Sequence, residues 1–369
     1  MRFYHLFWLA LVPVCLTSCA GKSTTSDQKQ GQTLQETHAH GEAAEYHVTG
    51  NCAMEFTAAD SARREAKYAE PGVKMVELST GHQVFTQTVG DNPDVKILTL
   101  HGGPACTHEY MKVLSNVLPE GRGYEVILYD QLGSFYSDQP TEDLWTMDRW
   151  CEEVEDVRKA LGLDASNFYL LGNSWGGILG MEYALRHQVN LNGLIVCNMV
   201  SSIPEYAAYN EEVLRPQMDP EILAQLEAFE AAGDIQNEAF LQLVQDHFYA
   251  KHICRLEEWP EDITGSFDRL NYKLYDLMQG PSEFRVGGRL IDWDITDRLG
   301  EIKVPTLMVG AEYDTMDPDK MTRQATLVAN GRSLHCYNGS HLCMYDDQKA
   351  FMGGVTNFIE DVEAGRPLR

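Results

Sequence analysis

The sequence has few basic residues for its size. Lys and Arg total 29 against 55 Asp and Glu in 369 residues, which leaves a formal net charge of −26. A surface with this charge repels phosphates and anionic head groups, which argues against nucleic acid as a partner and against a polybasic membrane contact. Internal repeats, Cys-x-x-Cys pairs and the Cys/His spacings of zinc sites are also missing, so we expect no metal and no cofactor.

Long apolar runs are scarce as well. The apolar stretch Phe3–Leu16 is too short to span a bilayer comfortably as a helix. Because Arg2 precedes this stretch and small residues follow it, residues 1–18 are interpreted as a secretory signal peptide.

The residues after that stretch suggest a lipid anchor. Leu16-Thr17-Ser18-Cys19 resembles the lipobox of bacterial lipoproteins, in which the cysteine becomes the lipidated first residue. An ordinary signal peptide cut near Ala20 is the alternative. In lipoproteins generally, Ala rather than Asp after the cysteine favours the outer membrane. We therefore expect a cell-envelope protein, anchored through Cys19 and facing the periplasm. A Cys19→Ala variant that stays on the membrane would reject this expectation.

The mature chain would begin with a flexible segment. Residues 19–46 are polar and without periodicity, and they are interpreted as the lipidated cysteine and its tether. His38, His40 and His47 lie in or beside the tether, but no Cys or carboxylate spacing completes a metal site there.

The cysteine count fits export but predicts little else. Nine cysteines are present, and seven remain once Cys15 and Cys19 are assigned to the leader and the anchor. Seven is odd, so at least one is unpaired within the chain. Most are expected to be small buried residues, with one or two disulfides possible in an oxidising periplasm. The seven are Cys52, Cys106, Cys151, Cys197, Cys254, Cys336 and Cys343.

Apolar runs and helical patterns alternate after residue 72. Runs such as Val95–Leu100 and Tyr124–Tyr129 are typical of strands buried on both faces, and Thr146–Leu161 has helical spacing. Such alternation predicts a mostly parallel sheet with helices on both faces. The expected strands are residues 73–78, 83–89, 95–100, 124–129, 167–171, 194–200, 304–310 and 333–337.

The alternation stops between residues 202 and 290, where apolar residues follow helical spacing alone. We therefore expect one α/β core in two parts, 47–201 and 291–369, interrupted by a helical cap. The cap accounts for the length of the chain without a second independent domain.

One motif in the core carries chemistry. Gly172-Asn173-Ser174-Trp175-Gly176 is a Gly-x-Ser-x-Gly motif between the expected strand 167–171 and the expected helix 178–186. The glycines are needed because this turn is strained and bulky neighbours would clash. At such a turn the Ser174 hydroxyl stands at the carboxyl edge of the sheet, where a helix dipole favours a developing anion. The strand–turn–helix context favours a nucleophile over an ordinary glycine-rich turn.

A nucleophilic serine needs a base and a group that orients the base. In α/β-hydrolases the chain order is Ser, then Asp or Glu, then His. Asp314 follows the expected strand 304–310, and His341 follows the expected strand 333–337. The oxyanion would accept from the N–H of Trp175 and from the Gly102-Gly103 loop, with Gly103 as the second donor and Gly102 beside the substrate.

Four motifs occur in order along the chain: His101-Gly102-Gly103-Pro104; Asp130-Gln131-Leu132-Gly133 with Ser137 and Pro140; Gly172-Asn173-Ser174-Trp175-Gly176-Gly177; and Glu312-Tyr313-Asp314 with Pro318. Together they resemble the proline iminopeptidase (prolyl aminopeptidase) family, from about Val73 to the C-terminus. The resemblance implies an α/β-hydrolase fold with a helical cap. It also implies release of N-terminal residues, often proline, from short peptides, although some close relatives hydrolyse amino-acid amides or esters.

The cap carries a further part of the resemblance. Tyr275 and the stretch from Met278 to Phe284 are similar to the family segment whose glutamate binds the free α-amine of the substrate. The resemblance implies that role for Glu283, with Tyr275 lining the same pocket. Two positions depart from the family pattern. Ala105 stands in the oxyanion loop where a glycine-type residue is usual, and Thr315 stands where several members have a second amine-binding glutamate.

These observations lead to one expected function and two alternatives. We expect a serine exopeptidase that releases an N-terminal proline or another small or apolar residue by acyl-enzyme chemistry. Its partners would be short peptides or amino-acid amides with a free N-terminus. The alternatives are an amino-acid amide or ester hydrolase of the same fold, and a lipid-anchored binding protein that has lost turnover.

Overall fold

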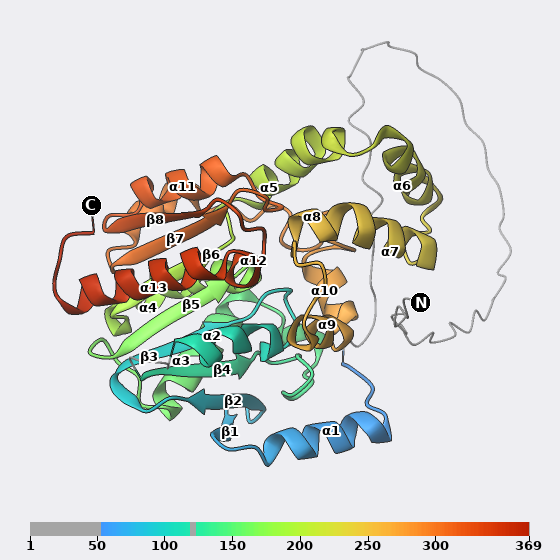
Figure 1. Ribbon diagram of the computed structural model, residues 1–369. Helices are drawn as coiled ribbons and strands as arrows, with labels where there is room; N and C mark the ends of the chain where they lie inside the picture. The colour runs from blue at the N-terminus through green and yellow to red at the C-terminus, as the bar shows by residue number, and fades with distance from the viewer. Residues whose placement is uncertain (1–52, 119–122, 369) are drawn as a thin grey trace, which may run out of the picture. The chain divides into compact units, whose positions relative to one another are not determined.

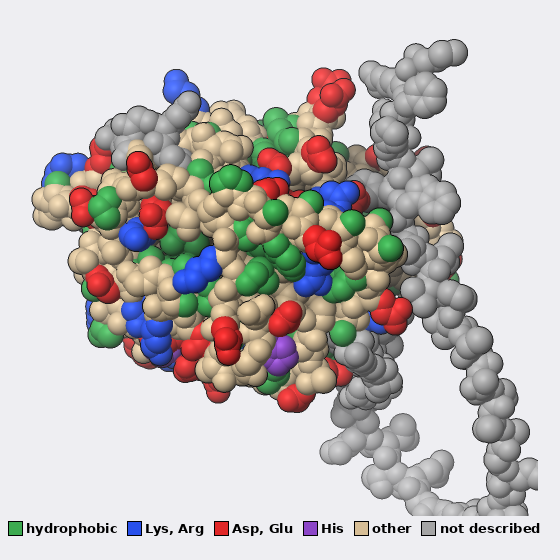
Figure 2. All heavy atoms as spheres, turned by 90° about the horizontal axis from the view of Figure 1, so that it is seen from below, with side chains coloured by type: hydrophobic (Ala, Val, Ile, Leu, Met, Phe, Trp, Pro, Cys, Tyr) green, Lys and Arg blue, Asp and Glu red, His purple; other side chains and the backbone are tan. Residues whose placement is uncertain are grey.

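The structure is a computed structural model that describes residues 53–118 and 123–368. The expected signal peptide, the lipidated Cys19 and the tether at 19–46 lie outside the described residues, so these interpretations stay predictions. In the part of the chain that is described, no helix has the length and apolar character needed to cross a membrane. On the face drawn in Figure 2, acidic side chains are spread over the surface rather than gathered in one patch.

An eight-stranded sheet forms the centre of the core, in the order β1-β2-β4-β3-β5-β6-β7-β8. The first three strands in this order pair antiparallel, and all later pairs are parallel. The prediction of a mostly parallel sheet is therefore confirmed. The strands are β1 Val73–Glu77, β2 Gln83–Val89, β3 Asn92–Leu100, β4 Tyr124–Asp130, β5 Phe168–Asn173, β6 Gly193–Cys197, β7 Thr306–Ala311 and β8 Gly331–Cys336.

Helices cover both faces of the sheet (Figure 1). Both faces of the sheet are apolar and need to be covered, as β5 illustrates. Its side chains alternate between the faces, and Phe168 and Leu170 belong to one apolar cluster while Tyr169 and Leu171 belong to another. The first cluster includes residues of α3, α4 and α11, and the second includes residues of α2, α12 and α13. These helices are α2 Lys112–Val117, α3 Met147–Ala160, α4 Trp175–His187, α11 Pro318–Leu327, α12 Cys343–Asp346 and α13 Gln348–Glu363. Short helical turns are η1 His108–Met111, η2 Glu142–Leu144, η3 Gln188–Asn190 and η7 Thr296–Glu301.

The cap lies between β6 and β7 and adds no strand to the sheet. Its two ends pair with each other, since Ile203 N donates to Trp293 O at 2.9 Å and Ile295 N donates to Ser201 O at 2.9 Å. Figure 1 shows its helices gathered at one end of the strands. They are α5 Ile203–Tyr209, η4 Asn210–Leu214, η5 Arg215–Gln217, α6 Pro220–Ala232, α7 Glu238–Val244, η6 Gln245–Tyr249, α8 Ala250–His252, α9 Glu261–Asp268 and α10 Tyr272–Met278.

Several details differ from the sequence-based expectations. Helix α1, Ala58–Tyr68, is not among the expected elements, although Thr57 and Asp60 form a reciprocal capping box at its start. Helix α4 begins at Trp175 rather than near residue 178, and β6 ends at Cys197 rather than near residue 200. Where cysteines are described, all six are buried and free, so no disulfide forms among them.

Candidate active site

Ser174 occupies a strained turn between β5 and α4. Its backbone has φ +57° and ψ −127°, a region that residues other than glycine rarely adopt. The flanking glycines allow this turn to form. A Cβ on Gly172 would lie 2.0 Å from the carbonyl oxygen of Gly176, and a Cβ on Gly176 would lie 2.0 Å from that of Leu100. The spacing of the motif therefore follows from close backbone approach on both sides of the serine.

Asp314 and His341 meet at the same edge of the sheet. Asp314 follows β7, His341 follows β8, and His341 Nδ1 lies 2.8 Å from Asp314 Oδ1. Both side chains are buried. Burial lowers the pKa of His341, but the charge and hydrogen bond of Asp314, aided by Glu283 and Asp346, raise it on balance above the ordinary 6.5. The pair therefore has the arrangement of a base and the carboxylate that orients it.

The histidine loop also lies close to the turn that holds Ser174. Asn173 Nδ2 donates to the carbonyl oxygen of His341 at 3.4 Å, which joins the residue before the serine to the histidine itself. Among the hydrogen bonds of the described residues, none joins Ser174 Oγ directly to His341. Such catalytic contacts are often long without substrate and tighten in the reacting complex.

Asn198 joins three of these loops and was missed by the sequence analysis. It follows β6 in a left-handed conformation with φ +53°. Its Nδ2 donates to Asp314 Oδ2 at 2.7 Å and to Ser340 O at 3.2 Å, and its Oδ1 accepts from Cys343 Sγ at 3.3 Å. The amide thus holds the carboxylate oxygen that His341 does not use. Its position at the carboxyl end of a central parallel strand was the signal that could have identified it.

Two backbone N–H groups next to Ser174 and in the Gly102-Gly103 loop have no protein acceptor among the described residues. Within the described segments, neither the N–H of Gly103 nor that of Trp175, the first residue of α4, donates to a protein acceptor. The N–H of Gly102 differs, because it donates to the Tyr110 hydroxyl at 2.6 Å and so is not available to a substrate. Gly102 instead provides space, since a Cβ there would lie 2.9 Å from Ser174 Cβ. Gly103 and Trp175 therefore each keep a backbone N–H that is not used by a protein acceptor, as their expected role as oxyanion donors requires.

Glu283 is a buried carboxylate of the cap that is surrounded by neutral donors. Tyr275 OH donates to Oε1 at 2.9 Å, Tyr206 OH donates to Oε2 at 2.5 Å, and Gln279 Nε2 lies 3.4 Å from Oε2. Burial, followed by the charge of Glu283, raises the pKa of both tyrosines well above the usual value, so both remain donors. Tyr206 was not among the expected site residues, because nothing in its local pattern distinguishes it from a core tyrosine.

Glu283 forms no ion pair with any Lys, Arg or His among the described residues. Its charge nevertheless acts on His341, whose pKa it helps to raise. Tyr206 contacts both Glu283 and the Thr315 side chain, which in turn contacts Asp314, so the carboxylate lies close to the Asp314–His341 pair. Thr315, the departure noted from the sequence, donates to Asp314 Oδ1 at 3.3 Å and adds no second negative charge beside Glu283. An unpaired buried carboxylate of this kind favours a cationic ligand.

No metal centre is part of this arrangement. Over the described ranges, no group of three or more His, Cys, Asp or Glu side chains could hold a metal ion.

Comparison with known proteins places the chain in a family. Residues 96–348 match the model of the α/β-hydrolase fold family. A proline iminopeptidase of Flavobacterium johnsoniae is 54% identical over 281 residues, which cover 76% of this chain and 94% of that protein. A proline iminopeptidase of Elizabethkingia meningoseptica is 55% identical over 295 residues, covering 78% of this chain and 98% of that protein.

A solved structure agrees with these relatives. The crystal structure of proline iminopeptidase from Mycobacterium smegmatis superposes with a TM-score of 0.73 at 30% identity, covering 79% of this chain and 99% of that chain. The protein is therefore an enzyme, a serine hydrolase of the aminopeptidase type. With the fold, the sheet-edge residues and these similarities in agreement, the chain belongs to the proline iminopeptidase family of α/β-hydrolases.

Proposed function

We propose that this enzyme releases an N-terminal proline, or another small apolar residue, from short peptides through an acyl-enzyme on Ser174. The observation that carries the proposal is Glu283, a buried carboxylate that pairs with no cation among the described residues and that helps to raise the pKa of His341. A substrate that brings its own cation to this position also brings its first carbonyl carbon towards Ser174. The names of the relatives support proline as the residue released.

The proposed reaction has two halves with the same base. In the first, His341 Nε2 takes the proton of Ser174 as Oγ attacks the carbonyl carbon, and Asp314 stabilises the imidazolium. The resulting oxyanion accepts from the N–H groups of Gly103 and Trp175. His341 then gives its proton to the leaving amine as the C–N bond breaks. In the second half, His341 takes a proton from water as the water oxygen attacks the ester carbon, and it then returns this proton to Ser174 Oγ as the ester C–O bond breaks and the free acid leaves.

Recognition of the amine sets the exopeptidase character. Glu283 would accept hydrogen bonds from the protonated α-amine, while Tyr206 and Tyr275 keep its two oxygens oriented. An internal peptide bond has no cationic amine next to it. Binding such a segment would leave the Glu283 carboxylate buried without a cation, which costs binding free energy. The proposed enzyme therefore selects chain ends by charge.

The amide and ester alternative draws on the same site. Among the described residues, Tyr206 and Tyr275 donate to no carboxylate besides Glu283, and Thr315 adds no second one, which leaves room for a less strict preference for proline and for amide substrates. Small amino-acid amides would satisfy the amine contact as well as peptides do. A comparison of prolinamide with Pro-Gly dipeptides separates the two activities.

A substrate panel tests the proposal. Pro-, Ala- and Leu-linked chromogenic amides are compared with their N-blocked forms, using the full chain and Glu283→Gln. We expect proline to be the best substrate and the blocked forms to resist cleavage. Glu283→Gln should raise KM for free-amine substrates about tenfold to a hundredfold, because a hydrogen bond to a charged group contributes about 1.5–3 kcal/mol.

Two controls accompany the panel. Tyr275→Phe removes one donor to Glu283 but keeps the charge, so its effect on KM should be smaller than that of Glu283→Gln. A simple activated ester lacks the amine and should report little change in either variant. Equal losses on amine-bearing and amine-free substrates would refute amine recognition by Glu283.

A further inference from the structure

The oxyanion loop, defined here as residues 101–107, is held from two sides by different parts of the protein. The core holds its first residues. His101 Nδ1 donates to Gly102 O at 2.9 Å, and its Nε2 accepts from Gln131 N at 3.1 Å. Burial lowers the pKa of His101, which keeps the ring neutral and suited to both roles. With the N–H of Gly102 bound to Tyr110, the start of the loop belongs to the core.

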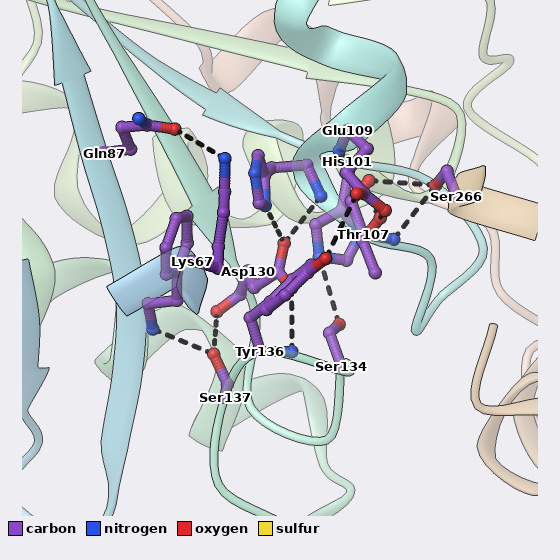
Figure 3. Close-up of polar contacts among 12 residues, drawn as sticks. Lys67, Gln87, His101, Thr107, Glu109, Asp130, Ser134, Tyr136, Ser137 and Ser266 are labelled. Atoms are coloured by element: carbon purple, nitrogen blue, oxygen red, sulfur yellow. Dashed lines mark hydrogen bonds and ion pairs between the residues drawn. The ribbon is translucent and has the colours of Figure 1, made fainter. Parts of the chain in front are cut away.

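The cap holds the rest of the loop. Ser266, on α9, accepts from Thr107 N and donates to Thr107 O, both at 3.1 Å, and both residues are fully buried. Asn271, which caps the start of α10, donates its N–H to Ala105 O at 3.1 Å. Figure 3 shows Ser266 reaching Thr107 from the neighbouring helix with two hydrogen bonds.

The middle of the oxyanion loop, residues 103–106, is contacted by hydrogen bonds from the cap. Among the described residues, the backbone hydrogen bond that enters residues 103–106 from beyond the loop comes from Asn271, and Ser266 contacts the Cys106 side chain and both backbone groups of Thr107. This part of the loop is strained, because Gly103 has φ +108° and Ala105 has φ +71°. A left-handed alanine persists only where its surroundings hold it.

We propose that Ser266 is a positioning residue for the oxyanion hole, through which the cap fixes the direction of the Gly103 N–H. The cap then contributes to the rate of the chemical step as well as to recognition of the amine. The proposal rests on the proposed function for the identity of the substrate. The claim that Ser266 positions the Gly103 N–H rests only on the contacts of the oxyanion loop.

The mechanism of this coupling is local. Without the Ser266 hydroxyl, the buried N–H of Thr107 loses its acceptor, whereas the Thr107 C=O keeps its role at the start of η1, and the loop must rearrange to satisfy the N–H. Because Thr107 is four residues from Gly103 and the turn between them is strained, such a rearrangement turns the Gly103 N–H away from the oxyanion. When the Gly103 N–H points away from the oxyanion, it stabilises the transition state less, while the binding of substrate through Glu283 is unchanged.

The test uses Ser266→Ala and the conservative Ser266→Thr in the full chain. We expect Ser266→Ala to lower kcat on a proline-linked amide about tenfold or more, below the 10²–10³ found for deletion of an oxyanion donor, with KM within about threefold. Ser266→Thr keeps the hydroxyl and should restore most of kcat. Asp262→Asn is the matched control, because Asp262 lies on the same helix and contacts Lys112 rather than the loop. It should leave kcat unchanged.

Inhibition separates positioning from simple destabilisation. Pyrrolidine-2-boronic acid adds to Ser174 Oγ, forming a B–O bond while the hydroxyl proton passes to His341, and it places an oxygen in the oxyanion hole. Its affinity should weaken in Ser266→Ala by about the same factor as kcat, whereas the affinity for free proline should stay within about twofold. Unchanged kcat and boronate affinity in Ser266→Ala, or equal weakening of boronate and proline, would overturn the proposal.

Two further measurements cover the cases in which Ser266→Ala does not fold or the proposed function is wrong. If Ser266→Ala does not fold, Ser266→Cys, which retains a weak donor and acceptor, gives the same comparison with an intermediate effect. Hydrolysis of a simple activated ester needs no amine. A loss in Ser266→Ala on this ester supports the loop proposal even if wild-type protein fails to cleave proline-linked amides, which would refute the proposed function alone.

Discussion

The core and the cap supply different halves of the site by different means. In the core, Ser174, Asn198, Asp314 and His341 all follow parallel strands, so the sheet itself brings their loops to one edge. In the cap, Glu283 is placed by tyrosines from α5 and α10, and no strand is involved. The comparison teaches that the loops of the proposed reacting groups are placed by the backbone of parallel strands, whereas the proposed recognition group is held by side-chain contacts.

The two halves meet in two loops. The cap reaches the oxyanion loop through Ser266 and Asn271, as described above. It also reaches the histidine loop, because His341 N donates to His252 O at 2.9 Å and Leu342 N donates to Ile253 O at 2.8 Å. The cap therefore contacts the loops of the proposed catalytic groups as well as holding Glu283. Mutations in the core and in the cap should show which kinetic parameters each part affects.

The largest expected effect is that of removing the nucleophile. Ser174→Ala should lower kcat on every substrate by at least about 10⁴-fold, because the acyl-enzyme can no longer form. KM for free-amine substrates should change little, since the proposed contact between Glu283 and the amine is retained. Steady-state kinetics with active-site titration measure both. Retained turnover in a preparation free of wild-type enzyme would refute the role of Ser174.

A smaller effect is expected for the core residue that orients Asp314. Asn198→Gly removes the amide and suits the left-handed backbone, so it isolates the side chain. We expect kcat to fall about tenfold to a hundredfold, as for other partners that orient the groups of a site. Asp314 loses a donor and acts more strongly on His341, which raises the pKa of the imidazole further. The acid limb of the pH profile should therefore move to higher pH.

A second variant, Asn198→Asp, tests whether the amide of Asn198 is needed as a donor to Asp314. It keeps tolerance of the left-handed backbone but places a carboxylate against Asp314, so its loss of kcat should exceed that of Asn198→Gly. Equal activity of Asn198→Gly and wild type, or an unchanged acid limb, would show that Asn198 only fills space.

The smallest expected effect is that of the cap's charge on the base of the core. His341 accepts the serine proton only when neutral, so activity is lost as pH falls through its pKa, which lies above the ordinary 6.5. After burial and Asp314, Glu283 contributes to that shift. Glu283→Gln should therefore move the acid limb to lower pH on an amine-free ester.

A second cap carboxylate provides the control for this measurement. Glu230→Gln removes a cap carboxylate that pairs with Arg215 instead, and it should leave the acid limb in place. If Glu283→Gln and Glu230→Gln shift the limb equally, general surface charge rather than the site would be responsible.

The sequence predicted the parts of this architecture that local pattern controls. Apolar runs of strand length indicated the parallel sheet, and the loops that follow those strands held Ser174, Asp314 and His341 as expected. The family resemblance directed attention to Glu283. Each of these predictions depends on residues that stand next to a recognisable element or motif.

The parts that were missed depend on contacts across the chain. Asn198 lies in an apolar stretch that the sequence analysis assigned to a strand, and only the bend after Cys197 turns its amide towards Asp314. Ser266 is 159 residues from Thr107, and no local spacing marks such a pair. Apart from Tyr68, helix α1 has no apolar residue larger than alanine, so its capping box at Thr57 and Asp60 was the clearest local signal.

The pairing of the two cap ends has a consequence for engineering. Because Ser201–Ile203 and Trp293–Ile295 pair with each other, the chain leaves the core for the cap and returns from it at one place. Exchange of caps between relatives is therefore a practical route to new peptide preferences. A donor cap would have to bring its own equivalents of Ser266 and Asn271, or the hybrid would bind its new substrate and turn it over slowly.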